Sequence, residues 1–405
     1  MRRIGIRGRI GIRGRIGIRT RIDCIRALFA EYLVWDTPFR VGSHHYARHF
    51  LDLGWEVGWL GGEFHPFNVL NNRPELARKF PIWRAGGLER GDLWQYAAFK
   101  LLPYRRWGPL DREGLAWQGD RWALPPVRRV LARAGFDHAD ILWLTNVHAY
   151  PWLVRQPGYR AVVYRAADDH AAFAASPRSL SAVEEAVVRR ADAVFAVSHA
   201  VYERLRRVRS EGVYHLPNGV DLGRFQAVQP RPPEYVDLRR PIAVYVGAIH
   251  YWFDLDLLAE VARRRDDVTF ILIGQAHVPL ARLAELSNVC FLGTRPPEQL
   301  PAYLQHADVG LIPFVRSSLT DSINPLKMYE YLACGLPVVS TDMAEVRAMA
   351  APVYVAQDVA TFCDALDAAL SVTDADREIY RAYAAQHTWQ ARYAQVDAVV
   401  ERLLG

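Results

Sequence analysis

Residues 322–340 have the sequence Ser-Ile-Asn-Pro-Leu-Lys-Met-Tyr-Glu-Tyr-Leu-Ala-Cys-Gly-Leu-Pro-Val-Val-Ser. This order of residue types predicts a polar loop, a short helix opened by Asn324 and Pro325, a stop at Gly335 and an apolar strand. Proline suits the first helical turn because its missing N–H would have no helical partner there. The pattern is typical of one loop–helix–strand step of an α/β domain.

The opening turn of this helix is expected to bind phosphate. Its free backbone N–H groups and the positive end of its dipole converge on one spot, and Lys327 adds a full charge. Glu330 follows on the same face, where a carboxylate accepts hydrogen bonds from paired hydroxyls such as those of ribose. A nucleoside-diphosphate pocket is predicted; a merely solvated lysine and glutamate are the alternative. The surrounding loop and first turn contain Ser322, Asn324, Pro325 and Leu326.

The same run closely resembles the C-terminal-domain motif of glycosyltransferase family 4, also called group 1, and of related GT-B enzymes. The resemblance implies that Lys327 contacts the diphosphate of a sugar nucleotide. It also implies that Glu330 is the second glutamate of the family's E-x7-E pair, which holds the ribose. Ser322 stands where the first glutamate is expected, with Asp321 one step earlier. The donor-sugar contact therefore does not carry over.

Composition indicates a globular protein of two to three domains. The chain has 405 residues, of which 51% are hydrophobic and 23% charged. No run approaches the ~18 uninterrupted apolar residues that span a bilayer. The four cysteines lack metal-like or paired spacing and are expected to be free thiols in a reducing cytosol. They are Cys24, Cys290, Cys334 and Cys363.

Residues 1–22 form a low-complexity tail in which Arg-Ile-Gly-Ile-Arg-Gly repeats. The tail carries eight arginines and no acidic residue, against a net charge of +6 for the chain. Its period of two would give a strand with one basic face, suited to anionic lipid or nucleic acid. A disordered tail, or upstream sequence outside the functional protein, is favoured instead.

The next segment predicts an α/β unit. Residues 25–30 are expected to be a strand, residues 44–53 a helix and residues 56–60 a second strand. Ligands of parallel sheets gather at the carboxyl ends of strands, which places Gly42 near a ligand. Residues 64–135 interleave aromatic and cationic residues, which suits a membrane surface or a lipid-diphosphate acceptor. An irregular helical insertion with solvated arginines is the equal alternative.

The α/β alternation returns at residue 140, and a Pro-rich stretch at 229–233 predicts a linker. Beyond the linker, three strands each end in a glycine whose absent Cβ lets a backbone approach a nucleotide. These glycines are Gly247, Gly274 and Gly293. Residues 378–404 are predicted to form one long amphipathic helix, which the GT-B pattern sends back onto the first domain.

Two further runs resemble family 4: residues 215–221, which contain Pro-Asn-Gly-Val-Asp, and residues 298–314. A second departure follows Gly247, where many members place Arg or Lys but this chain has Ala-Ile-His. Lys327 is then the principal cation, with Arg316 or His250 as possible helpers. The resemblance implies a GT-B fold of two Rossmann-like, doubly wound parallel-sheet domains. The expected divisions are 1–22 tail, 23–228 acceptor domain, 229–240 linker, 241–380 nucleotide-sugar domain and 381–405 crossover helix.

A base candidate lies in the run Tyr-Arg-Ala-Ala-Asp-Asp-His at residues 164–170. Asp168 and Asp169 would repel each other if both were buried, which raises one pKa. The run is similar to a segment of inverting glucuronosyltransferases of bacterial exopolysaccharide synthesis whose aspartate is the proposed base, and Asp168 matches it. The alternative is an aspartate pair that caps the next helix. His148 is a weaker candidate.

The resemblance implies a glycosyltransferase whose catalytic residues are Asp168, Lys327 and Glu330. Its donor would be a UDP- or GDP-sugar and its acceptor a saccharide or lipid-linked saccharide of the cell envelope or an exopolysaccharide. No metal, further cofactor or nucleic acid is expected, and the expected place is the cytoplasm, with peripheral association with the inner membrane face. A sugar-nucleotide 2-epimerase and a catalytically weak GT-B partner subunit are the alternatives. Donor, acceptor, linkage, stereochemistry and oligomeric state stay open.

Overall fold

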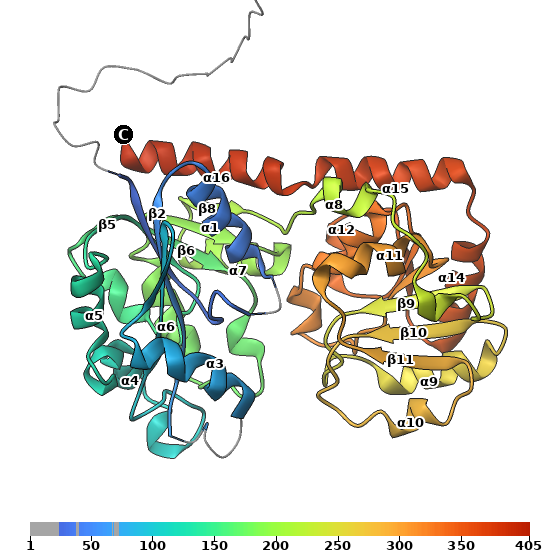
Figure 1. Ribbon diagram of the computed structural model, residues 1–405, viewed down its shortest axis with the longest axis horizontal. Helices are drawn as coiled ribbons and strands as arrows, with labels where there is room; N and C mark the ends of the chain where they lie inside the picture. The colour runs from blue at the N-terminus through green and yellow to red at the C-terminus, as the bar shows by residue number, and fades with distance from the viewer. Residues whose placement is uncertain (1–23, 38–39, 67, 69–72) are drawn as a thin grey trace, which may run out of the picture.

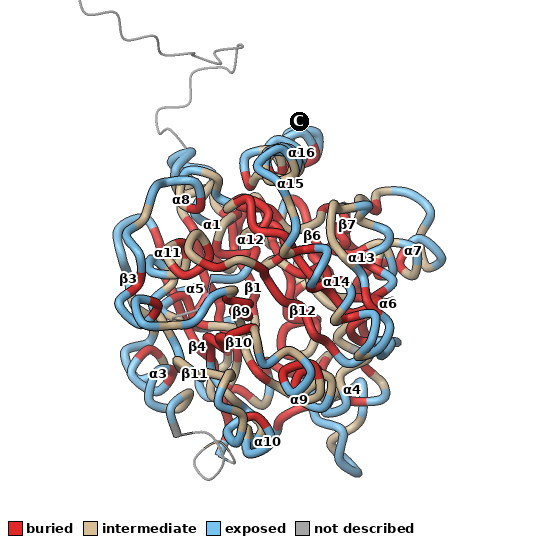
Figure 2. Tube along the Cα trace, turned by 90° about the vertical axis from the view of Figure 1, so that its right-hand side faces the viewer, coloured by how far each residue is buried: buried red, intermediate tan, exposed pale blue. Residues whose placement is uncertain are grey.

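The computed structural model describes residues 24–37, 40–66, 68 and 73–405. The chain forms two α/β domains that lie side by side, each built on one mainly parallel sheet (Figure 1). Buried residues concentrate in the strands and in the helix faces against them (Figure 2). The repeat at residues 1–22 lies outside the described residues.

The first sheet has eight strands in the order β3-β4-β2-β1-β5-β6-β7-β8. Every pairing is parallel except that of β3 with β4. The carboxyl ends of the other strands therefore share one edge, which is where an α/β sheet gathers ligands. The strands are β1 (Arg26–Ala30), β2 (Glu56–Phe64), β3 (Leu88–Arg90), β4 (Leu93–Phe99), β5 (Ala139–Leu144), β6 (Tyr159–Ala166), β7 (Ala193–Ala196) and β8 (Val213–His215).

Two clusters of buried side chains cover the two faces of this sheet. One contains residues of α1 and of the last helix, and the other residues of α5, α6 and α7. Strands covered on both faces have unbroken apolar runs in the sequence, as residues 141–144 of β5 do. The helices of this domain are α1 (Gly42–Asp52), α3 (Arg73–Arg84), α4 (Glu113–Trp117), α5 (Val127–Ala134), α6 (Leu180–Val188) and α7 (His199–Val208).

Residues 64–135 are more than a helical insertion. They supply β4, which pairs with β2, and β3 beside it at the sheet edge. Six of the seven residues of β4 are buried, including Gln95, whose Nε2 donates to Asp36 Oδ2 at 2.5 Å. A strand buried on both faces shows no alternation of polar and apolar residues, so its sequence lacks the usual period of two.

The second sheet has six parallel strands in the order β11-β10-β9-β12-β13-β14 around one core cluster. The strands are β9 (Ile242–Val246), β10 (Thr269–Ile273), β11 (Val289–Gly293), β12 (Val309–Ile312), β13 (Val338–Thr341) and β14 (Tyr354–Ala356). The helices from the domain junction onward are α8 (Leu222–Gln226), α9 (Leu255–Arg264), α10 (Ala281–Ala284), α11 (Leu300–Gln305), α12 (Leu326–Ala333), α13 (Ala344–Ala348) and α14 (Val359–Leu370).

The prediction of one helix over 378–404 is wrong. The chain ends in two helices, α15 (Asp374–Gln386) and α16 (Trp389–Leu404), which follow one another along the top of both domains (Figure 1). The break is bound by the backbone of Val220, which donates to His387 O and accepts from Trp389 N. An added Cβ at Gly219 would lie 2.8 Å from the Trp389 N atom, so glycine is needed where the two backbones meet.

These last helices connect the domains. α15 packs against α12 of the second domain, whereas α16 packs against α1 and β6 of the first. Trp389 of α16 stacks on His45 of α1 with ring centroids 4.0 Å apart. Among the described helices, none has the length and apolar character needed to cross a membrane.

Candidate active site

α12 lies at the carboxyl edge of the second sheet and carries Lys327 in its first turn. The helix begins at Leu326, one position later than expected, and Pro325 is the extended residue before it. Lys327 Nζ donates to the Tyr245 hydroxyl at 3.2 Å and lies 4.4 Å and 4.5 Å from the ring centres of Tyr245 and Phe314. Burial lowers the pKa of Lys327 to about 7, against the opposing charge of Glu330. A bound anion would hold the proton on this lysine.

The three glycines that end strands lie next to one another at this edge. Gly247 N donates to Ile273 O, and Gly274 N donates to Gly293 O. Gly247 has a φ of +146°, and a Cβ there would lie 2.9 Å from Lys327 Nζ. The structure thus brings Gly247 and Lys327 together, with Gly274 and Gly293 extending the same edge away from α12.

Glu330 lies one turn behind Lys327 and faces a second cation that sequence reasoning missed. Burial raises the pKa of Glu330 to about 7, against the positive charges of Arg224 and Lys327. Arg224 belongs to α8, directly after the Pro-Asn-Gly-Val-Asp run, and its Nη2 also donates to Pro297 O. Its proximity to that run was the only sequence signal. This side of α12 therefore offers two cations and one carboxylate.

The side chains of Ser322 and Asn324 serve the protein's own structure. Ser322 Oγ donates to Leu319 O at 2.7 Å. Asn324 Oδ1 accepts from Asn218 N at 3.1 Å, and Asn324 O accepts from Asn218 Nδ2 at 2.9 Å. The two motifs that stand out in the sequence, 106 residues apart, are therefore hydrogen-bonded to each other and join the domains.

The other candidates around the donor edge have separate positions. Asp321 Oδ1 accepts from Ala344 N at 2.7 Å at the start of α13. His250 stacks on Trp252 at 4.3 Å, and Arg316 is exposed on the loop after β12. A cavity of about 460 Å³ opens beside His250.

Asp168 follows β6 at the carboxyl edge of the first sheet. Burial raises the pKa of Asp168 to about 6, against the charge of Arg165 and assisted by that of Asp169. Asp169 has a different partner, because its Oδ1 lies 3.6 Å from Arg204 Nη2, and Arg204 also pairs with Glu184. The two adjacent aspartates therefore have different partners. Asp169 pairs with Arg204, whereas Asp168 lies in the field of Arg165.

Glu31 is a functional candidate that sequence reasoning missed. It directly follows β1, is 2% exposed and accepts a hydrogen bond from Thr145 Oγ1 at 2.8 Å. Burial raises the pKa of Glu31 to about 7. Hydrogen bonds with Thr145 and Ser43 and the charge of Arg165 act in the opposite direction and limit this rise. Its position after the first strand was the only signal. Arg165 therefore lies in the field of two carboxyl groups with raised pKa values.

Gly42, His44 and His45 lie in the first turn of α1. Gly42 is packed against the Arg165 guanidinium, which donates to Asn218 Oδ1 at 3.4 Å. Burial lowers the pKa of His44 to about 4 and that of His45 to about 3, so both rings are neutral. The ring of His148 lies 5.2 Å from that of Tyr104, and burial lowers the pKa of His148 to about 4.

The two edges meet across the domain junction. Leu326, the first residue of α12, packs against the first-domain cluster that contains Trp389 and residues of α1. Arg224 acts electrostatically on both His45 and Glu330, one from each domain. The arrangement offers a cationic helix N-terminus on one side and a carboxylate with raised pKa on the other. A hollow of about 800 Å³ beside Arg26 and Glu56 lies at the opposite edge and contains none of these groups.

Residues 240–371 match the protein family described as Glycosyl transferases group 1. A similar curated protein is named "Putative teichuronic acid biosynthesis glycosyltransferase TuaH", from Bacillus subtilis (strain 168), and is 28% identical over 182 residues. That alignment covers 43% of this chain and 46% of TuaH, so the match spans about half of the relative's length. The predicted resemblance to group 1 glycosyltransferases is confirmed.

Solved structures match nearly the whole chain. An α,α-trehalose-phosphate synthase (UDP-forming) from Burkholderia vietnamiensis has a TM-score of 0.69 and 13% identity, over 96% of this chain and 99% of that one. Anabaena HepE, solved in complex with UDP-glucose, has a TM-score of 0.61 and 16% identity, over 93% of this chain and 100% of that one. At these identities the likeness concerns the fold alone. The predicted GT-B fold is confirmed.

Proposed function

We propose that this chain, a GT-B protein with a group 1 glycosyltransferase domain, transfers a sugar from a nucleoside-diphosphate sugar to a saccharide or lipid-linked acceptor. The observation that carries the proposal is the first turn of α12. There Lys327 Nζ lies beside Gly247, and Leu326 packs against the first domain. The diphosphate would lie at this turn, with the ribose hydroxyls on Glu330 and the nucleobase toward Gly274 and Gly293.

The reaction follows from the charges at the two edges. An acceptor hydroxyl attacks the anomeric carbon, and a new C–O bond forms while its proton passes to Asp168. The bond between that carbon and the diphosphate oxygen breaks, and both its electrons leave with the nucleoside diphosphate. Lys327 and the α12 N–H groups stabilise the charge that develops there. An Asp168 with a pKa of about 6 is ionised at neutral pH and basic enough to take the proton.

The proposal includes transfer without a divalent cation. Lys327 and the helix N-terminus supply positive charge at the diphosphate, and Arg224 adds a guanidinium beside Glu330. These groups are the protein's alternative to a metal ion as a leaving-group stabiliser.

The acceptor is proposed to be a growing cell-envelope or exopolysaccharide chain reached at the inner membrane face in the cytoplasm. TuaH, by its name, belongs to teichuronic acid biosynthesis. The first domain exposes apolar side chains among cations after β4, where Trp107 is 69% exposed and follows Arg105 and Arg106. Leu101 and Leu102 are exposed on the same segment. Such a mixture suits the headgroup region of an anionic membrane.

A donor panel tests this proposal. Purified chain is incubated with UDP- and GDP-sugars in EDTA, with and without membrane extract, and release of UDP or GDP is measured. We expect release from one donor to rise when extract is added. Interconversion of sugar nucleotides without acceptor would indicate the 2-epimerase activity instead. No turnover of any donor in the presence of extract would support the catalytically weak partner subunit.

A further inference from the structure

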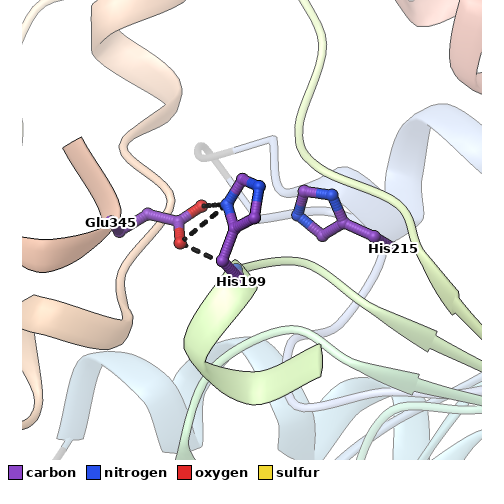
Figure 3. A group of neighbouring side chains, drawn as sticks. All are labelled: His199, His215 and Glu345. Atoms are coloured by element: carbon purple, nitrogen blue, oxygen red, sulfur yellow. Dashed lines mark hydrogen bonds and ion pairs between the residues drawn. The ribbon is translucent and has the colours of Figure 1, made fainter. Parts of the chain in front are cut away.

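Three ligating side chains meet at a different part of the domain junction. His199 begins α7, His215 ends β8, and Glu345 comes from α13 of the second domain. One ligating atom of each lies within 4.8 Å of the others. Figure 3 shows the His199 ring between the Glu345 carboxylate and the His215 ring.

Glu345 is held in place by both domains. It is 1% exposed, its Oε2 accepts from His199 N at 2.7 Å, and its Oε1 accepts from Asn324 Nδ2 at 2.9 Å. His199 Nδ1 lies 3.3 Å from Oε2. The carboxylate is therefore fixed in direction, as a ligand supported by outer hydrogen bonds is in metal sites.

His215 has unused bonding capacity. Its ring centre lies 4.1 Å from that of His199, and its Nε2 is buried without a hydrogen-bond partner among the described residues. A buried polar atom without a partner is costly, and bound water or an ion commonly satisfies such an atom.

A cavity of about 290 Å³ is lined by His199, His215 and Asn324, the residue that donates to Glu345. It has room for waters that would complete a coordination shell. Its wall includes Arg392, whose guanidinium donates to Asn218 O and contacts His387 Nδ1 at 2.7 Å. This nearby positive charge opposes a cation, so we expect micromolar rather than nanomolar affinity.

We propose that His199, His215 and Glu345 bind one divalent transition-metal ion, Zn²⁺ by preference, which ties the two domains together. Two imidazoles and one carboxylate with a water in the fourth position are a typical zinc ligand set. Neutral His199 would bind through Nδ1, with its proton on Nε2. Ligands bonded at about 2.1 Å in a tetrahedron lie roughly 3.5 Å apart. Glu345 Oε2 and His199 Nδ1, 3.3 Å apart, already have nearly this separation.

The site is separate from the donor pocket, so the metal takes no part in the sugar-transfer steps. Asn324 forms the connection, since it contacts Glu345 and lies three residues before Lys327. A ligand that binds only the folded protein raises its stability. Because the metal bridges the domains, it stabilises their observed arrangement.

The test uses untagged full-length chain stripped with EDTA and titrated with Co²⁺ as a spectroscopic substitute for Zn²⁺. We expect visible d–d absorption from one ion per chain and its displacement by Zn²⁺. His199→Ala and His215→Ala should each weaken binding at least about tenfold. His138→Ala, at an exposed histidine beside Asp137, is the matched control and should leave binding unchanged.

A second readout guards against misfolded variants. Zn²⁺ should raise the unfolding temperature of the wild type and of His138→Ala but not of His215→Asn, whose metal-free unfolding should match the wild type. Absence of a Co²⁺ spectrum in the wild type would overturn the proposal. So would a spectrum of wild-type strength in both His199→Ala and His215→Ala. Neither measurement uses a sugar donor, so a failed metal site and a failed transferase are distinguishable.

Discussion

The two edges of the junction differ in how the chain builds them. The second-domain edge takes its helix N-terminus, cation and carboxylate from one short segment that contains Lys327 and Glu330. The first-domain edge assembles Glu31 from the end of β1 with Arg165 and Asp168 from the end of β6. Both edges contain carboxyl groups with raised pKa values. Sites of comparable electrostatics thus leave very different signatures in a sequence.

Replacing Asp168 tests the first-domain edge and should have the largest effect. Asp168→Asn keeps the shape of the side chain but removes the proton acceptor, and we expect turnover to fall by about 10²- to 10⁴-fold with little change in donor binding. Asp169→Asn is the matched control. Its carboxylate pairs with Arg204 rather than with the proposed reaction path, so turnover should stay within a few-fold. Steady-state rates of nucleotide release measure both.

The comparison between the aspartates is decisive for the assignment of the base. Equal losses in the two variants would mean that the pair acts through the structure of the loop. An undiminished rate in Asp168→Asn would remove the residue from the mechanism.

Replacing Lys327 tests the second-domain edge. Lys327→Met retains the length of the side chain without its charge, and we expect kcat/KM to fall by about 10²- to 10³-fold because the leaving diphosphate loses a stabilising cation. The unfolding temperature should not fall, since burial already disfavours the charge of this lysine. Arg263→Met removes an exposed cation at the far end of α9 and is the control. Full turnover in Lys327→Met would refute the diphosphate assignment.

The fold of the second domain could be predicted because three of its strands end at a local signal. Gly247, Gly274 and Gly293 mark these ends, and all have positive φ angles. The first domain gave fewer signals, since β4 is buried along almost its whole length and shows no alternation. The break between α15 and α16 could not be predicted, because Val220, far away in the sequence, binds the backbone there.

The candidate site also contains residues that the sequence could reveal and one that it could not. Lys327 and Glu330 lie on one helix, so their spacing alone predicted a shared face. Asp168 became a candidate through the neighbouring Asp169, its place after a strand and its resemblance to a known run. Glu31 was missed because a single carboxylate after a strand has no pattern, and its burial depends on Thr145 and Ser43 from other elements.

Glu330→Gln sharpens the description of the second-domain edge. The ribose hydroxyls would lose a charged acceptor, and we expect UDP or GDP binding to weaken by about ten- to hundredfold. Binding of pyrophosphate should not weaken, because the change removes a negative charge near the phosphates. Glu378→Gln, at an exposed glutamate of α15, is the control. Calorimetric titrations measure both ligands, and parallel losses for nucleotide and pyrophosphate would contradict the ribose assignment.

Glu31→Gln should have the smallest effect on turnover. It tests whether Glu31 and Asp168 both interact with Arg165. In the wild type, ionisation of Asp168 should raise the rate through pH 6, and ionisation of Glu31 should raise it again near pH 7. The second increase, about twofold, arises because ionised Glu31 attracts Arg165 and leaves Asp168 a stronger base. Glu31→Gln should retain only the inflection near pH 6. A wild-type profile with one inflection would show that Glu31 and Asp168 do not share this arginine.

Stability gives an independent measure of the same carboxyl group. The folded state raises the pKa of Glu31 from 4.5 to about 7, so the folded protein prefers the protonated form. The resulting penalty is absent below pH 4.5, grows as the pH rises and is complete above pH 7. Glu31→Gln removes it, so the variant should gain stability relative to the wild type over that interval, by up to about 3 kcal/mol. A stability difference that stays constant from pH 4.5 to 8 would mean that Glu31 keeps an ordinary pKa, and the first-domain edge would then lack the electrostatic likeness to the second.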